Sequence, residues 1–184
     1  MGREARTTLL LGPTHHTPTH HSLLETKRFH TSTELQMLLE AAWPDHDLLL
    51  MAAAVADYRP RNPSLEEKLP RSQAGLTLEL EATPDLLAGL AEQSRPEQLR
   101  VGWALESREQ LRERAVKKLS SKQLHMIVAN PLETLESASI QPLVLAAGID
   151  GPEELAIPSP RMEKSDFAEW LVDEALARQQ ALSG

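Results

Sequence analysis

The sequence predicts an α/β fold: a Rossmann-like, mostly parallel sheet with helices on both faces and an antiparallel hairpin or flap. Short apolar runs typical of strands alternate with segments of helical periodicity along most of the chain. Near the carboxyl end, two strand-like segments flank an Asp-Gly turn, which indicates the hairpin. A chain of 184 residues can bury a core without disulfides or metals, so we expect one domain over residues 1–184.

The first part of the chain contains two predicted strands and a helix between them. Thr7–Leu11 is an apolar run that ends at a Gly-Pro pair. Residues 35–42 have helical periodicity, and Thr31 with Glu34 stands at the spacing of a capping box at the start of that helix. Residues 48–54 form the next predicted strand, which we expect to be buried.

A long loop and a second helix follow. Residues 57–75 are rich in proline, charge and small side chains, so we expect a loop, and loops of that length usually carry function. Residues 76–80 alternate like a strand. The tripeptide Thr-Pro-Asp at residues 83–85 is typical of a helix start with proline at the first helical position. The helix over Leu86–Ala91 should end before Pro96.

The next elements continue the alternation. Residues 99–105 form a predicted strand. Ser107 and Gln110, again at capping-box spacing, open a helix that extends to about Leu119. Residues 126–129 form a short strand that we expect to be buried.

A hairpin and a helix end the chain. Residues 142–149 and 154–157 form the predicted hairpin, which turns at Asp150-Gly151. The last helix is capped by Ser165. Its apolar residues recur at helical spacing on one face, and they are Phe167, Ala168, Leu171, Val172, Ala175 and Leu176.

The composition excludes several classes of function. The chain has no cysteine, which excludes a thiolate nucleophile, a disulfide and a zinc–thiolate site. A net charge of -8 and 3% aromatic residues exclude nucleic acid as an expected partner, because that surface needs basic and aromatic side chains. The longest apolar run, residues 48–56, is too short for a bilayer, and the start lacks a signal-peptide pattern. We therefore expect a cytoplasmic protein with no membrane partner.

The segment MAAAVADYRP, residues 51–60, carries the strongest functional signal. Its alanines leave room for a flat ligand near the backbone, and Asp57, Tyr58 and Arg59 add an acceptor, a ring and a cation. In open α/β sheets, ligands bind at the carboxyl ends of strands. The alternative is structural: the alanines let a helix pack closely, and Asp57 caps a turn.

Four histidines lie in the tract HHTPTHH: His15, His16, His20 and His21. This spacing is compatible with a metal site. We expect the alternative, a solvated loop, because the tract contains proline and follows the end of a strand. We therefore assign no metal-ligating residue.

Six features, including the segment at residues 51–60, occur in a specific order along the chain. They are MAAAVADYRP at 51–60, KLPR at 68–71, TPDLL at 83–87, VGWALES at 101–107, Lys118 with Lys122, and IVAN at 127–130. Together they resemble phosphopantothenate-cysteine ligase, the carboxyl-terminal half of the bacterial bifunctional coenzyme A biosynthesis flavoprotein. The order and approximate spacing agree from about Thr7 to Gln179.

The resemblance implies a reaction and its ligands. That family activates the carboxylate of phosphopantothenate with CTP and releases pyrophosphate, and the amine of cysteine then attacks the acyl-cytidylate. Magnesium (Mg) is the implied cofactor, since a divalent ion bridges phosphates while cations of the protein face them. The resemblance also implies a homodimer, paired through the flap of the sheet, and no flavin.

The resemblance further implies roles for single residues. Lys68 would be catalytic and stabilise developing charge, and its alternative is a solvated loop lysine. Lys118 and Lys122, four apart on a helix, would hold the polyphosphate, or would only complement the helix dipole. Trp103 would line the nucleotide pocket, or would pack in the core. The other implied nucleotide contacts are Met51, Ala52, Ala53 and Asp57 at the base and sugar, and Pro84, Asp85, Leu86 and Leu87 at a helix start that is otherwise a plain cap.

The chain also differs from the family pattern. The family's ligase region begins with a strand and a Gly-rich loop that bears asparagine and serines, whereas this sequence starts near the family's second strand. We expect a truncated start, a half-site from another chain, or impaired ligase chemistry. Pro70 and Arg71 replace lysines, His125 replaces an aspartate, and Pro131 replaces an acid. The second functional hypothesis is therefore a non-catalytic nucleotide-binding remnant or partner subunit.

Overall fold

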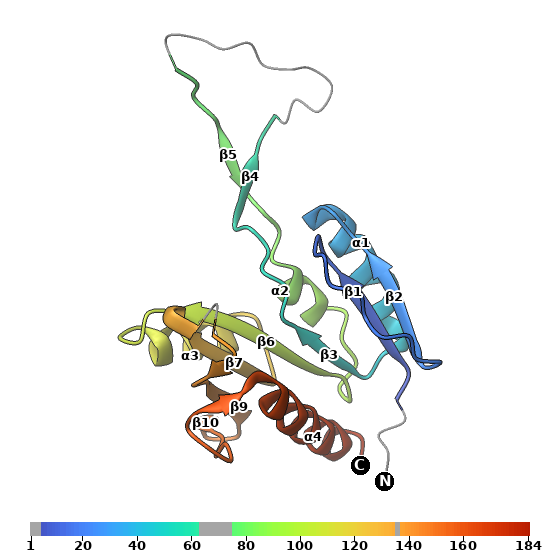
Figure 1. Ribbon diagram of the computed structural model, residues 1–184, viewed down its shortest axis with the longest axis vertical. Coiled ribbons are helices and arrows are strands. Elements are labelled where there is room, and N and C mark those ends of the chain that lie inside the picture. The colour runs from blue at the N-terminus through green and yellow to red at the C-terminus, as the bar shows by residue number, and fades with distance from the viewer. Residues whose placement is uncertain (1–4, 63–74, 135–136) are drawn as a thin grey trace.

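The computed structural model describes residues 5–62, 75–134 and 137–184, and Figure 1 shows its elements. The strands are β1 Thr7–Leu11, β2 Leu24–Arg28, β3 Leu48–Met51, β4 Tyr58–Pro60, β5 Leu80–Ala82, β6 Leu99–Glu106, β7 Met126–Pro131, β8 Ser139–Ile140, β9 Leu143–Gly148, β10 Gly151–Glu154 and β11 Met162–Glu163. The helices are α1 Ser32–Ala42, α2 Leu86–Ala91, α3 Leu111–Ser121 and α4 Lys164–Leu182, with 3₁₀ turns η1 Trp43–Asp45 and η2 Leu132–Thr134. In these described ranges, no helix has the length and apolar character needed to cross a membrane.

The central sheet has five strands in the order β10-β9-β7-β6-β3. β3, β6 and β7 run parallel, with Leu50 opposite Val101 and Val101 opposite Met126. β9 and β10 form an antiparallel hairpin at one edge. β1 and β2 form a separate parallel pair, and β4 with β5 forms an antiparallel arm that projects from the rest of the chain (Figure 1). The predicted α/β class, with a mostly parallel arrangement and an antiparallel hairpin, is confirmed.

Two hydrophobic cores lie on the two faces of this sheet. Successive strand residues point to opposite faces, so Val101 and Val128 pack with Phe167 of α4, whereas Ala104 and Ile127 pack with α1, α2 and α3. Phe167 is 4% exposed, and full burial of such a side chain contributes roughly 1.5–3 kcal/mol. Helices on both faces of the sheet are therefore confirmed.

The helices approach β6 most closely at Gly102. A Cβ atom there would lie 2.6 Å from Leu124 Cδ1 and 3.3 Å from Leu87 Cδ1. Because side chains from α2 and from the end of α3 occupy that space, only glycine fits this position without displacement.

The predicted start of α1 is confirmed in detail. Thr31 is the N-cap, and its Oγ1 accepts a hydrogen bond from the Glu34 backbone N–H at 3.1 Å. The Glu34 carboxylate accepts from the His30 N–H at 2.7 Å, one residue before the cap. The Thr31 hydroxyl thereby satisfies a donor that the first turn of the helix leaves free, and the Glu34 carboxylate binds the residue before the cap.

Three strand predictions need correction. β3 ends at Met51 rather than at residue 54, and Leu50 is 38% exposed, so the strand is only partly buried. Tyr58–Pro60 lies in the predicted loop but forms β4. Its partner β5 is Leu80–Ala82, which overlaps the predicted strand over 76–80 at one residue only. The pairing joins residues distant in sequence, and an ion pair between Arg59 Nε and Glu81 Oε1 at 2.8 Å lies across it. The periodicity of one segment does not show which distant segment it pairs with, so the sequence did not predict this pairing.

β2 was not predicted. Leu24–Arg28 has the sequence LETKR, which lacks an apolar alternation, and it forms a strand because it pairs along the whole of β1.

Two helix starts also differ from the prediction. Asp85 caps α2 through its side chain, so Pro84 precedes the cap instead of opening the helix. α3 begins at Leu111 with Gln110 as N-cap, and no side chain caps it. Ser107 contributes only a backbone carbonyl, which accepts from the Gln110 N–H at 3.1 Å.

The last helix and the hairpin differ slightly as well. Glu163 is the N-cap of α4, and the Ser165 hydroxyl instead contacts the Asp166 carboxylate. The hairpin is confirmed, but its turn is Ile149-Asp150, and its second strand is Gly151–Glu154 rather than residues 154–157, with a φ of +124° at Gly151. On α4, the predicted apolar face is buried at three positions and exposed at Ala168.

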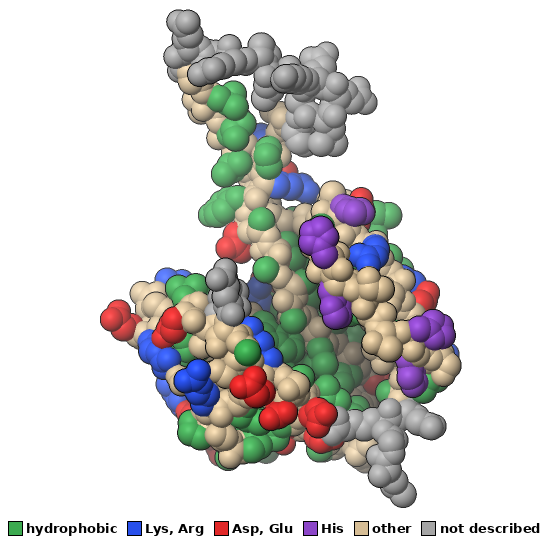
Figure 2. Space-filling view, viewed as in Figure 1, with side chains coloured by type: hydrophobic (Ala, Val, Ile, Leu, Met, Phe, Trp, Pro, Cys, Tyr) green, Lys and Arg blue, Asp and Glu red, His purple; other side chains and the backbone are tan. Residues whose placement is uncertain are grey.

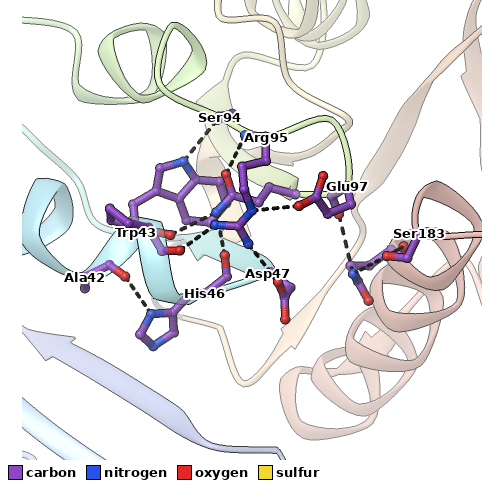
Figure 3. A network of polar contacts seen from close by, with 11 residues as sticks. Ala42, Trp43, His46, Asp47, Ser94, Arg95, Glu97 and Ser183 are labelled. Carbon is purple, nitrogen blue, oxygen red and sulfur yellow. Dashed lines mark hydrogen bonds and ion pairs between the residues drawn. The ribbon is translucent and has the colours of Figure 1, made fainter.

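A polar network fixes the amino ends of β3 and β6 (Figure 3). The Trp43 Nε1 donates to Ser94 Oγ at 3.0 Å, and His46 Nδ1 donates to the Ala42 carbonyl at 2.8 Å. Arg95 donates to the Asp47 carboxylate at 3.0 Å and to Glu97 at 2.7 Å. The network therefore holds the segment before β3 against the segment before β6.

Candidate functional site

The carboxyl edge of the parallel strands carries most of the predicted site. Met51, the last residue of β3, is buried, whereas Ala52 and Ala53 are exposed just beyond it. Asp57 is exposed, and its carbonyl accepts from the Thr83 N–H at 2.9 Å. That bond places the exit from β3 beside the entry to α2.

The two predicted lysines on α3 each hold a carboxylate. Lys118 Nζ lies 2.7 Å from Glu106 Oε1, at the carboxyl end of β6. Lys122 Nζ lies 3.1 Å from Asp85 Oδ2, at the start of α2. The lysine side chains are 36% and 29% exposed, so solvent screens both pairs and each is a weak constraint. An anion with higher charge density would compete for these ammonium groups.

The start of α2 presents one polar and two apolar side chains. Asp85 Oδ1 accepts from the Ala88 N–H at 3.2 Å while its other oxygen binds Lys122. Pro84 is exposed, and Leu86 and Leu87 are buried in the core under α1 and α3. A shallow hollow of about 80 Å³ lies here, lined by Gln36, Leu39, Glu40, Pro84, Asp85, Leu86, Gly89 and Leu90.

Two buried oxygens near this edge have no hydrogen-bond partner within the described residues. They are Asn130 Oδ1 on β7 and Thr83 Oγ1 before α2. Asn130 stands opposite Leu105 in the β6–β7 ladder, next to Glu106. Because a buried polar atom without a partner costs free energy, both positions are suited to a donor supplied by a ligand or by water.

Trp103 lies apart from these groups. Its half-buried side chain packs against the core under α4, whereas α2 and α3 lie on the opposite face of β6. Lys122 is ion-paired to Asp85 at the start of α2 and Lys118 to Glu106 on β6, whereas the Trp103 ring packs on the opposite face of the sheet. Lys68 lies outside the described residues.

The carboxylates at this edge fit only a limited role as magnesium ligands. The described part of the chain contains no group of three or more His, Asp or Glu side chains that could hold a metal. Magnesium usually keeps several waters and takes one or two carboxylates together with substrate phosphates. Glu106 and Asp85 fit that smaller role, and a protein-only cage does not fit.

The histidine tract forms part of a surface loop between β1 and β2. His15, His16, His20 and His21 are all exposed, and Figure 2 shows histidines spread over that side of the molecule. They form no metal cluster within the described residues.

A larger hollow, of about 370 Å³, contains none of the predicted site residues. It lies beside the end of α3 and the β9–β10 turn and is lined by Leu119, Ser120, Gln123, Leu124, His125, Ala147, Gly148, Gly151 and Pro152. Next to it, Arg100 is 4% exposed and donates to the Gln123 carbonyl at 2.6 Å, while its Nε has no partner in the part of the chain that the structure describes. Burial lowers the pKa of Arg100, and burial together with the charge of Arg100 lowers the pKa of His125. A lowered pKa favours the neutral form of the His125 imidazole, which lines this hollow.

Two residues of the site were not assigned from the sequence. Glu106 and Asn130 both follow apolar strand runs, at the ends of VGWAL and of IVA. A polar residue directly after a buried strand is the signal that identifies them, because the carboxyl ends of parallel strands meet at one edge.

Comparisons with known proteins show the family of this chain. The family described as DNA/pantothenate metabolism flavoprotein C-terminal domain matches residues 1–178. A protein named cysteine/cysteine sulfinic acid decarboxylase, from an unknown prokaryotic organism, is 33% identical over 129 residues, which are 70% of this chain and 35% of that protein. The coenzyme A biosynthesis bifunctional protein CoaBC of Bacillus subtilis (strain 168) is 33% identical over 103 residues, which are 56% of this chain and 25% of that protein.

A solved structure, the C-terminal domain of CoaBC, matches with a TM-score of 0.66 and 27% identity. The match covers 96% of this chain and 76% of that domain. The chain thus spans about a third or less of the length of the two curated relatives.

Proposed function

The chain belongs to the family of the DNA/pantothenate metabolism flavoprotein C-terminal domain, and from this membership we propose that it catalyses the CTP-dependent joining of phosphopantothenate to cysteine. The coenzyme A biosynthesis relatives support this role, as does the position of the candidate site at the carboxyl edge of the sheet. The proposal places the enzyme in the cytoplasm, as the sequence predicts.

One observation carries the proposal. Lys118 on α3 and Lys122, the residue that ends this helix, are held by carboxylates from two other elements, Glu106 on β6 and Asp85 at α2. A triphosphate can displace these carboxylates, because it offers several charged oxygens to the same two ammonium groups. The released carboxylates are then available to a phosphate-bound magnesium ion.

The proposed reaction has two steps. A carboxylate oxygen of phosphopantothenate attacks the α-phosphorus of CTP, and the bond to pyrophosphate breaks. The amine of cysteine then attacks the acyl carbon, loses a proton, and CMP leaves as the amide forms. Lys118 and Lys122 would bind the phosphates, Lys68 would stabilise charge in the first step, and magnesium, held by Glu106 or Asp85, would supply further positive charge at the phosphates.

The competing hypothesis is a non-catalytic nucleotide-binding subunit. Pyrophosphate release measured with CTP, magnesium and phosphopantothenate separates the two hypotheses. The ligase should release about one equivalent without cysteine and turn over repeatedly when cysteine is added. Saturable CTP binding without any pyrophosphate or amide would establish the binding subunit instead.

A pair of neighbouring lysines tests the role of the site. Lys118→Met should lower kcat/KM for CTP by about a hundredfold or more, as expected for loss of a charged group at a phosphate. Lys117→Met is the matched control, because Lys117 is exposed one residue earlier on the same helix. Equal effects of the two substitutions would contradict the proposed phosphate contact.

The proposal includes a homodimer formed through the arm of β4 and β5. Leu76, Leu78 and Leu80 are 69%, 58% and 52% exposed, and Figure 2 shows hydrophobic side chains along this arm. Residues at this spacing share one face of an extended chain, and a contiguous apolar face of that kind usually meets a partner. The mass measured by light scattering should be that of a dimer. Leu78→Asp should dissociate the dimer. Leu132→Asp, at a residue outside the arm that is also 52% exposed, should leave the dimer intact.

A further inference from the structure

The larger hollow lies at an edge of the sheet that the proposed reaction does not use. His125 directly precedes β7, and Ala146 near the end of β9 stands opposite Met126. The hollow is therefore at the amino end of β7, whereas Glu106 of the candidate site stands opposite Pro131 at the carboxyl end. Its volume is about 370 Å³, and an apolar cavity of about 150 Å³ already holds benzene. The hollow therefore has room for a small organic molecule.

The lining of the larger hollow is part apolar and part polar. Leu119, Leu124 and Pro152 offer apolar surface, and Ser120 and Gln123 offer a hydroxyl and an amide. In the part of the chain that the structure describes, no Lys, Arg, Asp or Glu side chain lines it. Such a lining suits an organic molecule with one polar end.

A buried positive charge lies next to this lining. Arg100 is 4% exposed, and its guanidinium donates to two carbonyls, of Gln123 at 2.6 Å and of Leu87 at 3.4 Å. Among the described residues, its Nε has no partner and no carboxylate pairs with it. A buried charge without an opposite charge is costly. An anion in the hollow would partly compensate it, because Gln123 and His125, which line the hollow, both hydrogen-bond to Arg100.

His125 adds a hydrogen-bond donor to the hollow. Its Nδ1 accepts from the Arg100 backbone N–H at 3.1 Å, so the neutral imidazole carries its proton on Nε2. Burial, and then the charge of Arg100, lower the pKa of His125, which favours this neutral form. The same charge of Arg100 that opposes a proton on the imidazole attracts an anion to it.

Gln123 has a backbone conformation that glycine usually occupies. Its φ is +48°, and it follows Lys122, the C-cap of α3. The Gln123 N–H donates to the Ser120 carbonyl at 3.1 Å, and the Leu124 N–H donates to the Leu119 carbonyl at 2.9 Å. This pair of bonds is the Schellman motif, which favours glycine at the position of Gln123. A strained residue with a side chain is typical of a ligand site, and this one lines the hollow.

One acid, Glu153 of β10, lies close to the hollow. A Cβ atom on Gly148 would be 3.9 Å from the Glu153 carboxyl carbon. The Glu153 carboxylate lies 2.9 Å from Arg178 Nη2 on α4. Its charge is therefore paired, which reduces its repulsion of an anion in the hollow.

We propose that the larger hollow binds a small monocarboxylate with an apolar body. The carboxylate accepts from Nε2–H of His125 and from the side-chain amide of Gln123, and the apolar body packs on Leu119, Leu124 and Pro152. Phosphate fits less well, because it has no apolar part and the lining offers no Lys or Arg for its second charge. The inference goes beyond the proposed reaction, since that reaction takes place at the opposite edge of the sheet.

Titration with benzoate tests the proposal on the 184-residue chain. Benzoate has a carboxylate on a flat apolar ring, and saturation in the millimolar range is expected for so small a probe. The amide signals of Gln123, Gly148 and Gly151 and the ring signals of His125 should shift. The titration contains no nucleotide, so its result is independent of ligase activity. No saturable shift of these signals would overturn the proposal.

Two further probes test the chemical class of the ligand. Benzamide has the same shape as benzoate without the charge, and it should bind about tenfold more weakly or less well still. Equal binding of benzamide would show that the hollow does not select a carboxylate. Inorganic phosphate should shift these signals much less than benzoate. An equal effect of phosphate would exclude the role of the apolar body.

A matched pair of substitutions tests the location of the site. Ser120→Trp places a large ring in the hollow and should abolish benzoate binding. Ser121→Trp should not, because Ser121 is exposed at the end of the same helix and is not among the residues that line the hollow. Equal binding by the two variants would contradict this location.

Gln123→Gly tests the role of the strained residue without endangering the fold. Glycine adopts the left-handed conformation freely, so the melting temperature should rise. Benzoate affinity should fall by about tenfold, because the side-chain amide is lost. Unchanged affinity would overturn Gln123 as a donor to the carboxylate.

Discussion

The side chain of Gln98 connects the segments that precede β3 and β6. Its Nε2 donates to the Trp43 carbonyl at 2.9 Å and to the His46 carbonyl at 2.6 Å. Its Oε1 accepts from the Arg95 N–H at 2.7 Å. Gln98 is 1% exposed, so water cannot replace these bonds without rearrangement. We therefore expect Gln98→Leu to weaken the fold although leucine has a similar volume.

The size of the effect follows from the groups left behind. Leucine removes all three hydrogen bonds and leaves two carbonyls and one N–H without this partner. A buried polar group without a partner costs about 1–3 kcal/mol. The bond to the Trp43 carbonyl is fully buried and the other two are partly accessible, so we expect a loss of about 3 kcal/mol in the free energy of unfolding.

Urea denaturation measures this loss. The midpoint should fall while the slope of unfolding free energy against urea stays constant, since the surface exposed on unfolding is unchanged. Gln93→Leu is the control, because Gln93 is exposed five residues earlier, and it should change stability by less than about 0.5 kcal/mol. A Gln98→Leu protein as stable as this control would refute the reasoning.

Three further changes test other parts of the structure. Burial and the charge of Arg100 lower the pKa of His125 from 6.5. The unfolded chain therefore takes up a proton first, and the free energy of unfolding falls as pH drops below about 6.5. His125→Asn should reduce that fall in urea titrations, and an identical pH dependence would contradict it. Gly102→Ala should lower the free energy of unfolding by about 1–3 kcal/mol, because the added Cβ would lie 2.6 Å from Leu124 Cδ1. The melting temperature should fall, and an unchanged melting temperature would contradict this prediction. Thr31→Ala should lower the free energy of unfolding by about 1 kcal/mol, because it removes the N-cap of α1. Thr31→Ser should retain most of that stability. Equal losses in the two variants would show that the hydroxyl does not stabilise the helix as a cap.

Local signals predicted much of the fold. Two such signals are the apolar runs of β6 and β7 and the capping pair of Thr31 and Glu34. Each depends only on residues close together in the sequence, so it can be recognised without the structure. β2 and β4 depend instead on partners elsewhere in the chain, and LETKR or YRP alone has no strand periodicity. Ser107 and Ser165 have the residue type of a cap, but each helix starts at a different residue.

The candidate site was predictable to a similar extent. Lys118 lies on α3 and Lys122 is the residue that ends it, so the predicted four-residue spacing falls at the helix terminus. Asp85 was assigned from the family resemblance and Glu106 was not, and no spacing rule predicts which lysine each of them pairs with. The direction of Trp103 depends on which face of β6 each helix covers, and that is decided by the order of the strands rather than by the motif around it.

Chemical-shift mapping with CTP and magnesium tests the central claim most directly. Amide signals should move at Ala52 and Ala53, at Asp85 to Leu87, and near Lys118 and Lys122. Signals around His125 and Gly148, which line the larger hollow, should stay in place. Shifts confined to that hollow, or no saturable shift at any concentration of CTP, would contradict a nucleotide site at the carboxyl edge of the sheet.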